Sequence, residues 1–579
     1  MENIEFEPIK LNEFEKDEIK NKICEKFDKL NEERRNQLSH IKSVRNAIFG
    51  TFSHNEAGSK KLNLPDAWEQ AATLKSHLLE AIPSYPDGLF DVFEDDNSSS
   101  ERANKHKLFL CNALEKMKFP EKLEKIIDQL IETGEITLFV GWEKRFRKRR
   151  SAITLYEKIQ NPLRNIFTTV KEKTYEGASL KIIPSHDFVF DTQRANRWDS
   201  CPKIHRSWME INEIFENKTN FSISKEQAQE LSLLLERSKK DKDTTGISDG
   251  LVEVLKFFGN IRLDSGKILK NYLIVVVGRL AVVQIEPNPY IECPYIYANI
   301  IQDPYTKRGL SPLAPVVPVL NTASEIMQTQ ILGHKLVSNP PFLAPRGAFH
   351  GEIEVKPGKI IEYDSSLLPQ MPQPLNFSAM LGGWEFIKFF KSQIEHATGV
   401  FDNMAGSVQE AGERTATELN YSATGQSARL NWFIDSINRK IIMPLLEKTA
   451  ATNANFMMGN SKISTIKEGE PITVEITPDV REGNFVYKYS DRKSTFAKNS
   501  KFKEIQKTIS EFSKIPEIAQ KINWQECFKY TLATLGVENT SKFLLTQEQI
   551  AQKNAQNSSQ KAKTQQNVLE GKKNEIQTP

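Results

Sequence analysis

The chain has 579 residues, and its 78 lysines and arginines nearly balance its 75 aspartates and glutamates, leaving a formal net charge of +3. This balance excludes the strong global positive field on which tight nucleic-acid binders rely. The hydrophobic fraction of 39% is ample for folding. Because a chain of this length exceeds one compact core, about two to four subdomains are expected.

Five cysteines are scattered along the chain, at Cys24, Cys111, Cys201, Cys293 and Cys527. They form no C-x-x-C pair and have no histidine cluster nearby in the sequence. We therefore expect neither a disulfide framework nor a metal site, and nothing in the sequence calls for a cofactor.

The first residues, Met-Glu-Asn-Ile-Glu, lack the basic and then apolar order of a signal peptide. The most apolar run, Leu273 to Val283, is interrupted by Arg279 and is too short to span a bilayer. We therefore expect a chain that is soluble in a reducing cytoplasm and has no membrane partner.

The N-terminal region is expected to be largely helical. An amphipathic surface or interface helix is predicted by four apolar residues at spacings of four, four and three: Ile19, Ile23, Phe27 and Leu30. The polar segment Asp91 to Arg102 predicts an exposed linker. Further helices are expected at about 104–132.

Strand-like segments follow these helices. Residues 136–142 and 153–156 are rich in β-branched and aromatic side chains and are predicted strands, while 252–285 predicts an antiparallel meander. The polar residues 237–249 predict a connection. Turns of the meander are expected at Gly259, Ser265-Gly266 and Gly278. Helices and sheets together predict an α+β fold.

A basic cluster lies just after the first of these strands. It places six basic residues within seven positions: Lys144, Arg145, Arg147, Lys148, Arg149 and Arg150. Such a cluster is typical of a nucleic-acid patch. It is also typical of a solvated loop, or of a knob that faces a partner, and this second interpretation is the one we favour.

A long helix is predicted at 319–338. Three prolines precede it, Thr322 and Glu325 have the spacing of a capping box, and Asn339-Pro340-Pro341 forbids its continuation. About 20 residues at about 1.5 Å each give roughly 30 Å. The apolar pieces within 339–378 predict a small β-rich excursion.

A second helix is predicted at 379–398, ended by Gly399. Its apolar residues recur at helical spacing: Trp384, Ile387, Phe390 and Ile394. Lys388 and Lys391 project from this helix. They either contact DNA phosphates or simply solvate the helix and pair with its glutamates.

A loop with three glycines, 399–413, comes next and leads into Arg414-Thr415-Ala416-Thr417-Glu418. Thr415 and Glu418 form a capping box, which predicts the start of a helix. The buried stripe of that helix is predicted to be Leu430, Phe433, Ile434, Ile437, Ile441 and Leu445. Pro444 is expected to bend or end the helix.

Two β-rich runs, Ile472–Ile476 and Phe485–Tyr489, predict a hairpin. Apolar residues return to helical spacing from Phe502 onward. The last segment, 546–579, is dominated by Gln, Asn, Lys and Ser and is expected to be disordered.

The familiar catalytic signatures are missing from the sequence. No Gly-Lys pair is followed by Ser or Thr, so no P-loop occurs. There is neither an H-E-x-x-H nor a G-x-S-x-G sequence. We therefore expect the chain not to be an enzyme, and no residue spacing identifies the catalytic group of an unfamiliar hydrolase.

The helix, the loop Gly399-Val400-Phe401-Asp402-Asn403-Met404 and the Arg-Thr-Ala-Thr-Glu sequence resemble the tunnel-loop region of portal proteins of short-tailed, podovirus-like bacteriophages. Further short motifs resemble those of portal proteins and occur in the same order along the chain: Gly134 with 136–142, Ile183-Pro184 with Phe190-Asp191, Asn288-Pro289-Tyr290, and Asn339-Pro340-Pro341. The resemblance covers roughly residues 60 to 490, and the order of the motifs carries it.

The resemblance implies a portal fold that assembles head to tail as a ring, a dodecamer in that family. It divides the chain into an N-terminal region and α/β wing (1–310), a stem helix (311–338), a β-rich clip (339–378), a second stem helix (379–398), a tunnel loop (399–413), a wing helix and hairpin (414–494), a modest helical crown (495–545) and a disordered tail (546–579).

Portal proteins are structural, so the resemblance implies a ring at the capsid vertex of the virion, assembled in the host cytoplasm, through which double-stranded DNA is packaged and ejected. Its implied partners are the terminase packaging motor and the capsid, scaffold and tail adaptor proteins. A near-neutral charge suits a channel, because DNA that must slide through it cannot be bound tightly at any one position.

The residues expected to contact DNA in the channel are Lys388, Lys391, Val400, Phe401, Asn403 and Met404. Two alternatives remain open: a DNA-binding head-to-tail adaptor, and a monomeric nucleic-acid-binding module that depends on the basic cluster.

Overall fold

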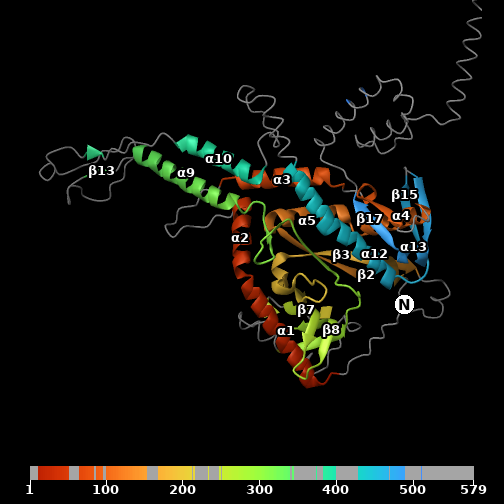
Figure 1. Cartoon of the computed structure of the whole chain (residues 1–579). Coiled ribbons are helices and arrows are strands. Elements are labelled where there is room, and N and C mark those ends of the chain that lie inside the picture. The colour runs from red at the N-terminus through yellow and green to blue at the C-terminus, as the bar shows by residue number, and fades with distance from the viewer. Residues whose placement is uncertain are drawn as a thin grey trace, which may run out of the picture. The chain divides into compact units, whose positions relative to one another are not determined.

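The computed structural model describes residues 11–50, 64–83, 86–94, 100–152, 167–210, 213–214, 233, 247–248, 251–338, 342–343, 373–374, 383–399, 428–467, 470–489, 507 and 510. The chain divides into two units, of which the larger comprises Met1–Ile463 and Val474–Ser490. This unit combines helices with antiparallel sheets (Figure 1), so its fold is α+β, as predicted.

The first helix, α1 (Glu13–Glu33), begins with a capping box formed by Asn12 and Glu15. Its predicted apolar stripe is buried: Ile19, Ile23, Phe27 and Leu30. These side chains pack against one face of the largest sheet, which confirms the amphipathic helix. Arg34 separates α1 from α2 (Arg35–Phe49), which ends at Gly50 in the left-handed region.

Three further helices build the main core: α3 (Asp66–Ala81), α4 (Ser100–Lys116) and α5 (Phe119–Thr133). A short 3-10 turn, η1 (Pro86–Gly88), and strand β1 (Phe90–Glu94) precede α4. The prediction of an exposed linker from Asp91 to Arg102 is therefore wrong at both ends. Its first residues belong to the paired strand β1, and its last residues belong to the helix α4.

Gly134 ends α5 at a point where only glycine fits. Its φ is +76°, and a Cβ there would lie 2.1 Å from the carbonyl carbon of Leu310. Gly309 approaches the same backbone from the other side, since its own Cβ would lie 2.3 Å from the Gly134 oxygen. This close passage fixes where the following strand begins.

A three-stranded antiparallel sheet has the order β10-β2-β3, with β2 (Glu135–Ala152) in the centre, β3 (Phe167–Ile183) and β10 (Tyr295–Asn299). The predicted strand at 136–142 is confirmed, but it is far longer than expected. The register between β2 and β3 shifts between Arg145 and Phe146, which marks a bulge.

The largest sheet runs β4 (Phe188–Phe190), β5 (Lys203–Glu210), β7 (Leu251–Arg262), β8 (Ile268–Val277) and β9 (Ala281–Pro287), with β6 (Ile247–Ser248) beside β7. The meander is confirmed, and Gly266 and Gly278 lie in its turns. Gly259 instead lies inside β7 at φ +138°, next to a register shift. The turn predicted there is wrong, because the glycine serves an irregularity within the strand.

Short elements connect the sheets to the long helices. These are η2 (Ser185–Asp187), η3 (Thr192–Arg194), and the paired strands β11 (Ile301–Gln302) and β12 (Gly309–Leu310).

The predicted long helix is α9 (Val316–Ser338), which starts three residues earlier than expected. Pro318 lies in its first turn, where a missing N–H costs nothing. The Thr322 hydroxyl donates to the Pro318 carbonyl at 3.0 Å within the helix, so Thr322 is not the predicted cap. The second helix, α10 (Gly383–Thr398), ends as predicted at Gly399, whose N–H donates to the Glu395 carbonyl.

The helix predicted after the tunnel loop is present from residue 428, and its apolar stripe, Leu430 to Leu445, is buried as predicted. Pro444 does not end it. The chain passes through a π-helical turn, η4 (Asn438–Ile442), and continues as α12 (Met443–Phe456). In that turn the Met443 N–H donates to the Asn438 carbonyl, so the wider turn accommodates the proline ring.

The predicted hairpin is wrong in its pairing. Strand β16 (Glu470–Ile476) pairs with β15 (Ser461–Lys467), and the short helix α13 (Pro478–Glu482) follows. Strand β17 (Phe485–Tyr489) pairs instead with β1, with Phe485 opposite Glu94 and Tyr489 opposite Phe90. Each run therefore has a different partner from the one its closeness in sequence indicated.

Several predictions lie wholly or mostly outside the described residues. They are the strand at 153–156, the connection at 237–249, the tunnel loop with its capping box, the crown and the tail. Within the predicted clip, the structure describes only β13 (Phe342–Leu343) paired with β14 (Gln373–Pro374).

Candidate functional site

The two predicted stem helices form an antiparallel pair. Helices α9 and α10 run side by side (Figure 1), and the paired strands β13 and β14 bring together the segments that follow α9 and precede α10. Within the described residues, the pair meets the main core at one end. Val316 and Leu320 of α9 and Ile394 of α10 are buried there.

The other end of the pair is not covered by the described chain. From Glu325 onward, none of the described α9 side chains is buried, and before Ile394 the same holds for α10. Large apolar side chains are exposed here: Phe386 at 56%, Phe389 at 55% and Ile331 at 42%. Such a cluster on a helix pair is typical of a surface that another protein covers.

Lys388 and Lys391 do lie on α10, as predicted, one turn apart on the same side of the helix. Lys388 is exposed and Lys391 is half-buried. The other proposed channel residues, Val400, Phe401, Asn403 and Met404, lie outside the described residues, as do Thr415 and Glu418.

The basic cluster lies on a strand rather than in a loop. Residues 144–150 belong to β2 and pair with β3, with Arg147 opposite Glu172 and Arg149 opposite Val170. Successive side chains of a strand point to opposite faces. The cluster is therefore split, with Arg145, Arg147 and Arg149 on one face and the other three on the opposite face. The prediction of a solvated loop is wrong, because β3 extends the strand.

Acidic neighbours neutralise part of this cluster. The Lys144 ammonium is 2.9 Å from Glu176, and the Arg145 guanidinium is 3.1 Å from Glu143 and lies 5.2 Å from the centre of the Tyr175 ring. Arg147, Lys148 and Arg149 are exposed, and they make no ion pair with a residue in the described ranges. The side chain of Arg150 is outside the description.

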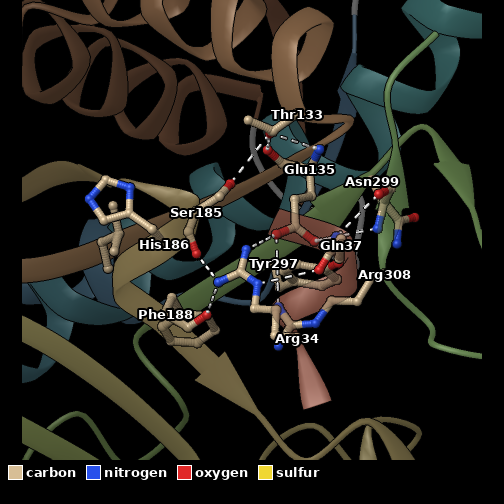
Figure 2. Close-up of polar contacts among 12 residues, drawn as sticks. Arg34, Gln37, Thr133, Glu135, Ser185, His186, Phe188, Tyr297, Asn299 and Arg308 are labelled. Carbon is tan, nitrogen blue, oxygen red and sulfur yellow. Dashed lines mark hydrogen bonds and ion pairs between the residues drawn. The ribbon is translucent and has the colours of Figure 1, made fainter. Parts of the chain in front are cut away.

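A buried ionic cluster, which the sequence did not predict, joins the helices to both larger sheets (Figure 2). Glu135, the first residue of β2, accepts hydrogen bonds from the Arg34 Nη2 at 2.5 Å and the Tyr297 hydroxyl at 2.7 Å. Gln37 Nε2 donates to the same carboxylate at 3.1 Å. Arg308 Nη1 is 3.8 Å from it. We call Arg34, Glu135, Tyr297 and Arg308, with Gln37, the ionic cluster.

Arg34 also ties this cluster to the turn before β4. Its Nη1 donates to the carbonyls of Ser185 and Phe188, the latter at 2.7 Å. The Arg308 guanidinium carbon lies 3.9 Å from the centre of the Phe190 ring. Both arginines and Glu135 are less than 5% exposed. The cluster therefore fixes α1, α2, β2, β4 and β10 relative to one another.

The electrostatics of the ionic cluster follow from its composition. Burial alone raises the pKa of Glu135, but the charges of Arg34 and Arg308 and the hydrogen bonds from Tyr297 and Gln37 outweigh it and lower the pKa below its ordinary value of 4.5. Burial lowers the pKa of Arg34 to about 10. Glu135 and Arg34 therefore both stay ionised at neutral pH and form a buried ion pair.

Sequence spacing gave no signal for this cluster, because its members come from three stretches of the chain, 34–37, 135 and 297–308, that are about 100 or more residues apart. The only local sign was an acidic residue at the start of a buried strand, directly after a helix-ending glycine.

The described residues contain no cluster of side chains suited to holding a metal ion, since no group of three or more His, Cys, Asp and Glu side chains among them could do so. Cys24, Cys111, Cys201 and Cys293 are not in disulfides, and burial raises the pKa of Cys24, Cys201 and Cys293. None of the helices in the described ranges is long and apolar enough to cross a bilayer.

No family model matches the chain, and a search of curated proteins also finds no match. Among solved structures, the chain is similar to one chain of a structure described as the virion of a native gene transfer agent particle. The identity is 12%, the match covers 81% of this chain and 89% of that chain, and the TM-score is 0.30. At this TM-score the likeness does not establish a shared fold.

Proposed function

We propose that this chain is the portal protein of a short-tailed phage-like virion. Copies would form a closed ring, a dodecamer as in the portal family, at one vertex of the capsid. Double-stranded DNA would be packaged and ejected through its centre. The terminase motor, the capsid and scaffold proteins and a tail adaptor would be its partners, and the ring itself would hydrolyse nothing.

The observation that supports this proposal is the half-covered pair α9 and α10. Its inner end belongs to the core, through Val316, Leu320 and Ile394, whereas its outer end exposes Phe386, Phe389 and Ile331. In a monomer these side chains would stay in water. In a ring with a head-to-tail interface, each pair could pack against the corresponding pair of the next copy.

The order of the sequence motifs supports the same proposal. Two helices of about 34 Å and about 24 Å, at about 1.5 Å per residue, occupy the positions that the resemblance assigns to the stem. A short β-paired segment separates them where the clip is expected.

The first test is electron microscopy of the purified full chain, with its mass in solution measured in parallel. We expect rings with a central hole and a mass that is a fixed multiple of the monomer. The double variant Phe386→Ser, Phe389→Ser should weaken assembly, because burial of two phenylalanines contributes about 3 kcal/mol or more per interface. That corresponds to more than about a hundredfold in the association constant.

Phe93→Ser is the matched control, because Phe93 is 53% exposed but lies on β1, away from the helix pair. It should assemble as the unchanged chain does. A chain that stays monomeric over a wide range of protein concentration and salt would contradict the ring proposal, as would a double variant that assembles normally.

The second candidate function is nucleic-acid binding by the strand β2, and the exposed Arg147, Lys148 and Arg149 favour it. If these residues contact phosphates, changing all three to alanine should lower the affinity for duplex DNA. It should also reduce the salt slope by up to about 3, at roughly 0.9 per phosphate contact. A filter-binding or anisotropy titration at several salt concentrations measures both quantities.

The matched control changes three scattered exposed lysines, Lys42, Lys125 and Lys488, to alanine. It removes the same charge without touching β2. Equal losses in the two triple variants would mean that only the overall charge matters, and this candidate function would then be excluded.

A further inference from the structure

A cavity of about 430 Å³ lies between α12, α13 and β17. One wall is made of small side chains on α12, namely Ala450, Ala451 and Ala454, and another of residues 484–487 at the start of β17. Arg481 of α13 lines the same space. Its volume falls within the range of pockets that bind small ligands or short peptide segments.

Arg481 is the unusual residue of this cavity. Its side chain is 97% buried, since only 3% of the residue is exposed, yet Nε and Nη1 have no hydrogen-bond acceptor among the described residues. Buried N–H groups without acceptors are unfavourable, and nearly all buried polar groups in folded proteins are paired. A ligand in the cavity that brings an oxygen acceptor to this guanidinium would be favoured for that reason.

The walls around Arg481 are held firmly in place. The His106 ring of α4 stacks on the Phe485 ring, with centroids 4.0 Å apart and planes at 17°. Its Nδ1 is 2.7 Å from the Val480 carbonyl and its Nε2 is 3.0 Å from the Tyr487 hydroxyl. Thus α4 braces the residue before Arg481 and the strand after it.

A second brace comes from Arg102 of α4. Its Nε and Nη2 donate to the Asp479 carbonyl at 3.1 and 2.6 Å, and its Nη1 is 2.8 Å from Glu94. Gly483 permits this approach, since a Cβ there would lie 2.5 Å from the Arg102 Nη2. A site whose walls are already held in place loses little conformational entropy when a ligand binds.

The mouth of the cavity has the opposite charge to its interior. Glu447 and Glu482 also line it, and both are exposed. A simple anion would be attracted by Arg481 but repelled by these carboxylates. A group with a carboxylate next to a positive charge satisfies both, with the carboxylate at Arg481 and the cation at the mouth.

We propose that this cavity binds a carboxylate group adjacent to a positive charge, with Arg481 donating hydrogen bonds to the carboxylate and Glu447 and Glu482 facing the cation. Two sources share this chemistry: a polypeptide segment in which an acidic residue precedes a basic one, and a free amino acid. The inference is independent of ring formation.

The test is calorimetric titration of the full chain with three probes: acetyl-Glu-Lys-amide, acetyl-Gln-Lys-amide and free glutamate. We expect the Glu-Lys peptide to bind at least tenfold more tightly than the Gln-Lys peptide, because only the former brings a charged acceptor to Arg481. Glutamate binding as tightly as the peptide would identify a free amino acid as the source; weaker glutamate binding would identify a polypeptide.

Arg481→Met should abolish the preference for the Glu-Lys peptide, whereas Arg439→Met, on the exposed side of η4, should keep it. Circular dichroism checks that both variants fold. If Arg481→Met does not fold, the double variant Glu447→Gln, Glu482→Gln tests the proposed site instead. It should weaken binding of acetyl-Glu-Lys-amide but not of acetyl-Glu-Ala-amide.

The proposal is overturned if the unchanged chain binds neither the Glu-Lys peptide nor glutamate, which would mean that water alone satisfies Arg481. Equal binding of the Glu-Lys and Gln-Lys peptides would overturn it as well.

Discussion

Replacing Arg34 by methionine should lower the free energy of unfolding by about 3–5 kcal/mol. The Arg34 guanidinium contacts Glu135 at 2.5 Å and donates to the carbonyls of Ser185 and Phe188. Methionine keeps an unbranched apolar stem but removes the charge and the guanidinium donors. The buried Glu135 then loses its nearest cation, because Arg308 is 3.8 Å away, and two buried carbonyls lose their donor.

The measurement is urea unfolding followed by tryptophan fluorescence at pH 7 and one protein concentration. Arg45→Met is the matched control in the neighbouring helix. Its ion pair with Glu132 spans 3.6 Å, and the Arg45 side chain is 65% exposed, so its loss should change stability by no more than about 1 kcal/mol. Similar small losses in both variants would show that the ionic cluster does not hold these elements together.

The second large effect concerns acid stability through His106. Burial, the largest influence, lowers the pKa of His106 from 6.5 to about 4, although the Val480 carbonyl acts in the opposite direction. The nearby Arg102 lowers it further. In the unfolded chain the ring takes up a proton as the pH falls through about 6.5. In the folded chain it stays neutral until about pH 4.

Unfolding therefore takes up a proton between these two pH values, and the stability that neutral His106 provides above pH 6.5 is lost as the pH falls toward 4. At about 1.4 kcal/mol per pKa unit, the loss is about 3 kcal/mol. His106→Phe should remove this part of the pH dependence, because phenylalanine can stack on Phe485 but cannot take up a proton.

Unfolding curves recorded from pH 7.5 to 4 measure this slope. A residual slope should remain from His205, whose pKa burial lowers to about 3. The control Phe485→Leu loses the ring stack but keeps His106, so it should be less stable at every pH and retain the full slope. An unchanged slope in His106→Phe would contradict the assignment.

Local sequence patterns predicted the elements whose burial repeats along their own length. The stripe of α1, with Ile19, Ile23 and Phe27, and the stripe from Leu430 to Leu445 are buried as predicted. The meander of β7, β8 and β9 is also confirmed. The two helices follow from the periodicity of their apolar residues, and the meander follows from the turns between consecutive strands.

Predictions failed where a distant partner decided the outcome. The basic cluster at 144–150 is a strand because β3 pairs with it. The run Phe485–Tyr489 pairs with β1, almost 400 residues earlier, and not with the adjacent Ile472–Ile476. Strand pairing between distant segments depends on the packing of the whole unit, which no short window of sequence contains.

By itself, the sequence determined the α+β class, the helix pair at the predicted stem, the stop at Gly399 and the absence of familiar catalytic signatures. Only the tertiary structure decided that Arg34, Glu135 and Arg308 form one buried ionic cluster, and that Nε and Nη1 of Arg481, beside a cavity, find no acceptor in the part of the chain that the structure describes. The reason is physical: periodicity is a local property, whereas the burial and pairing of a charge depend on what the rest of the chain places around it.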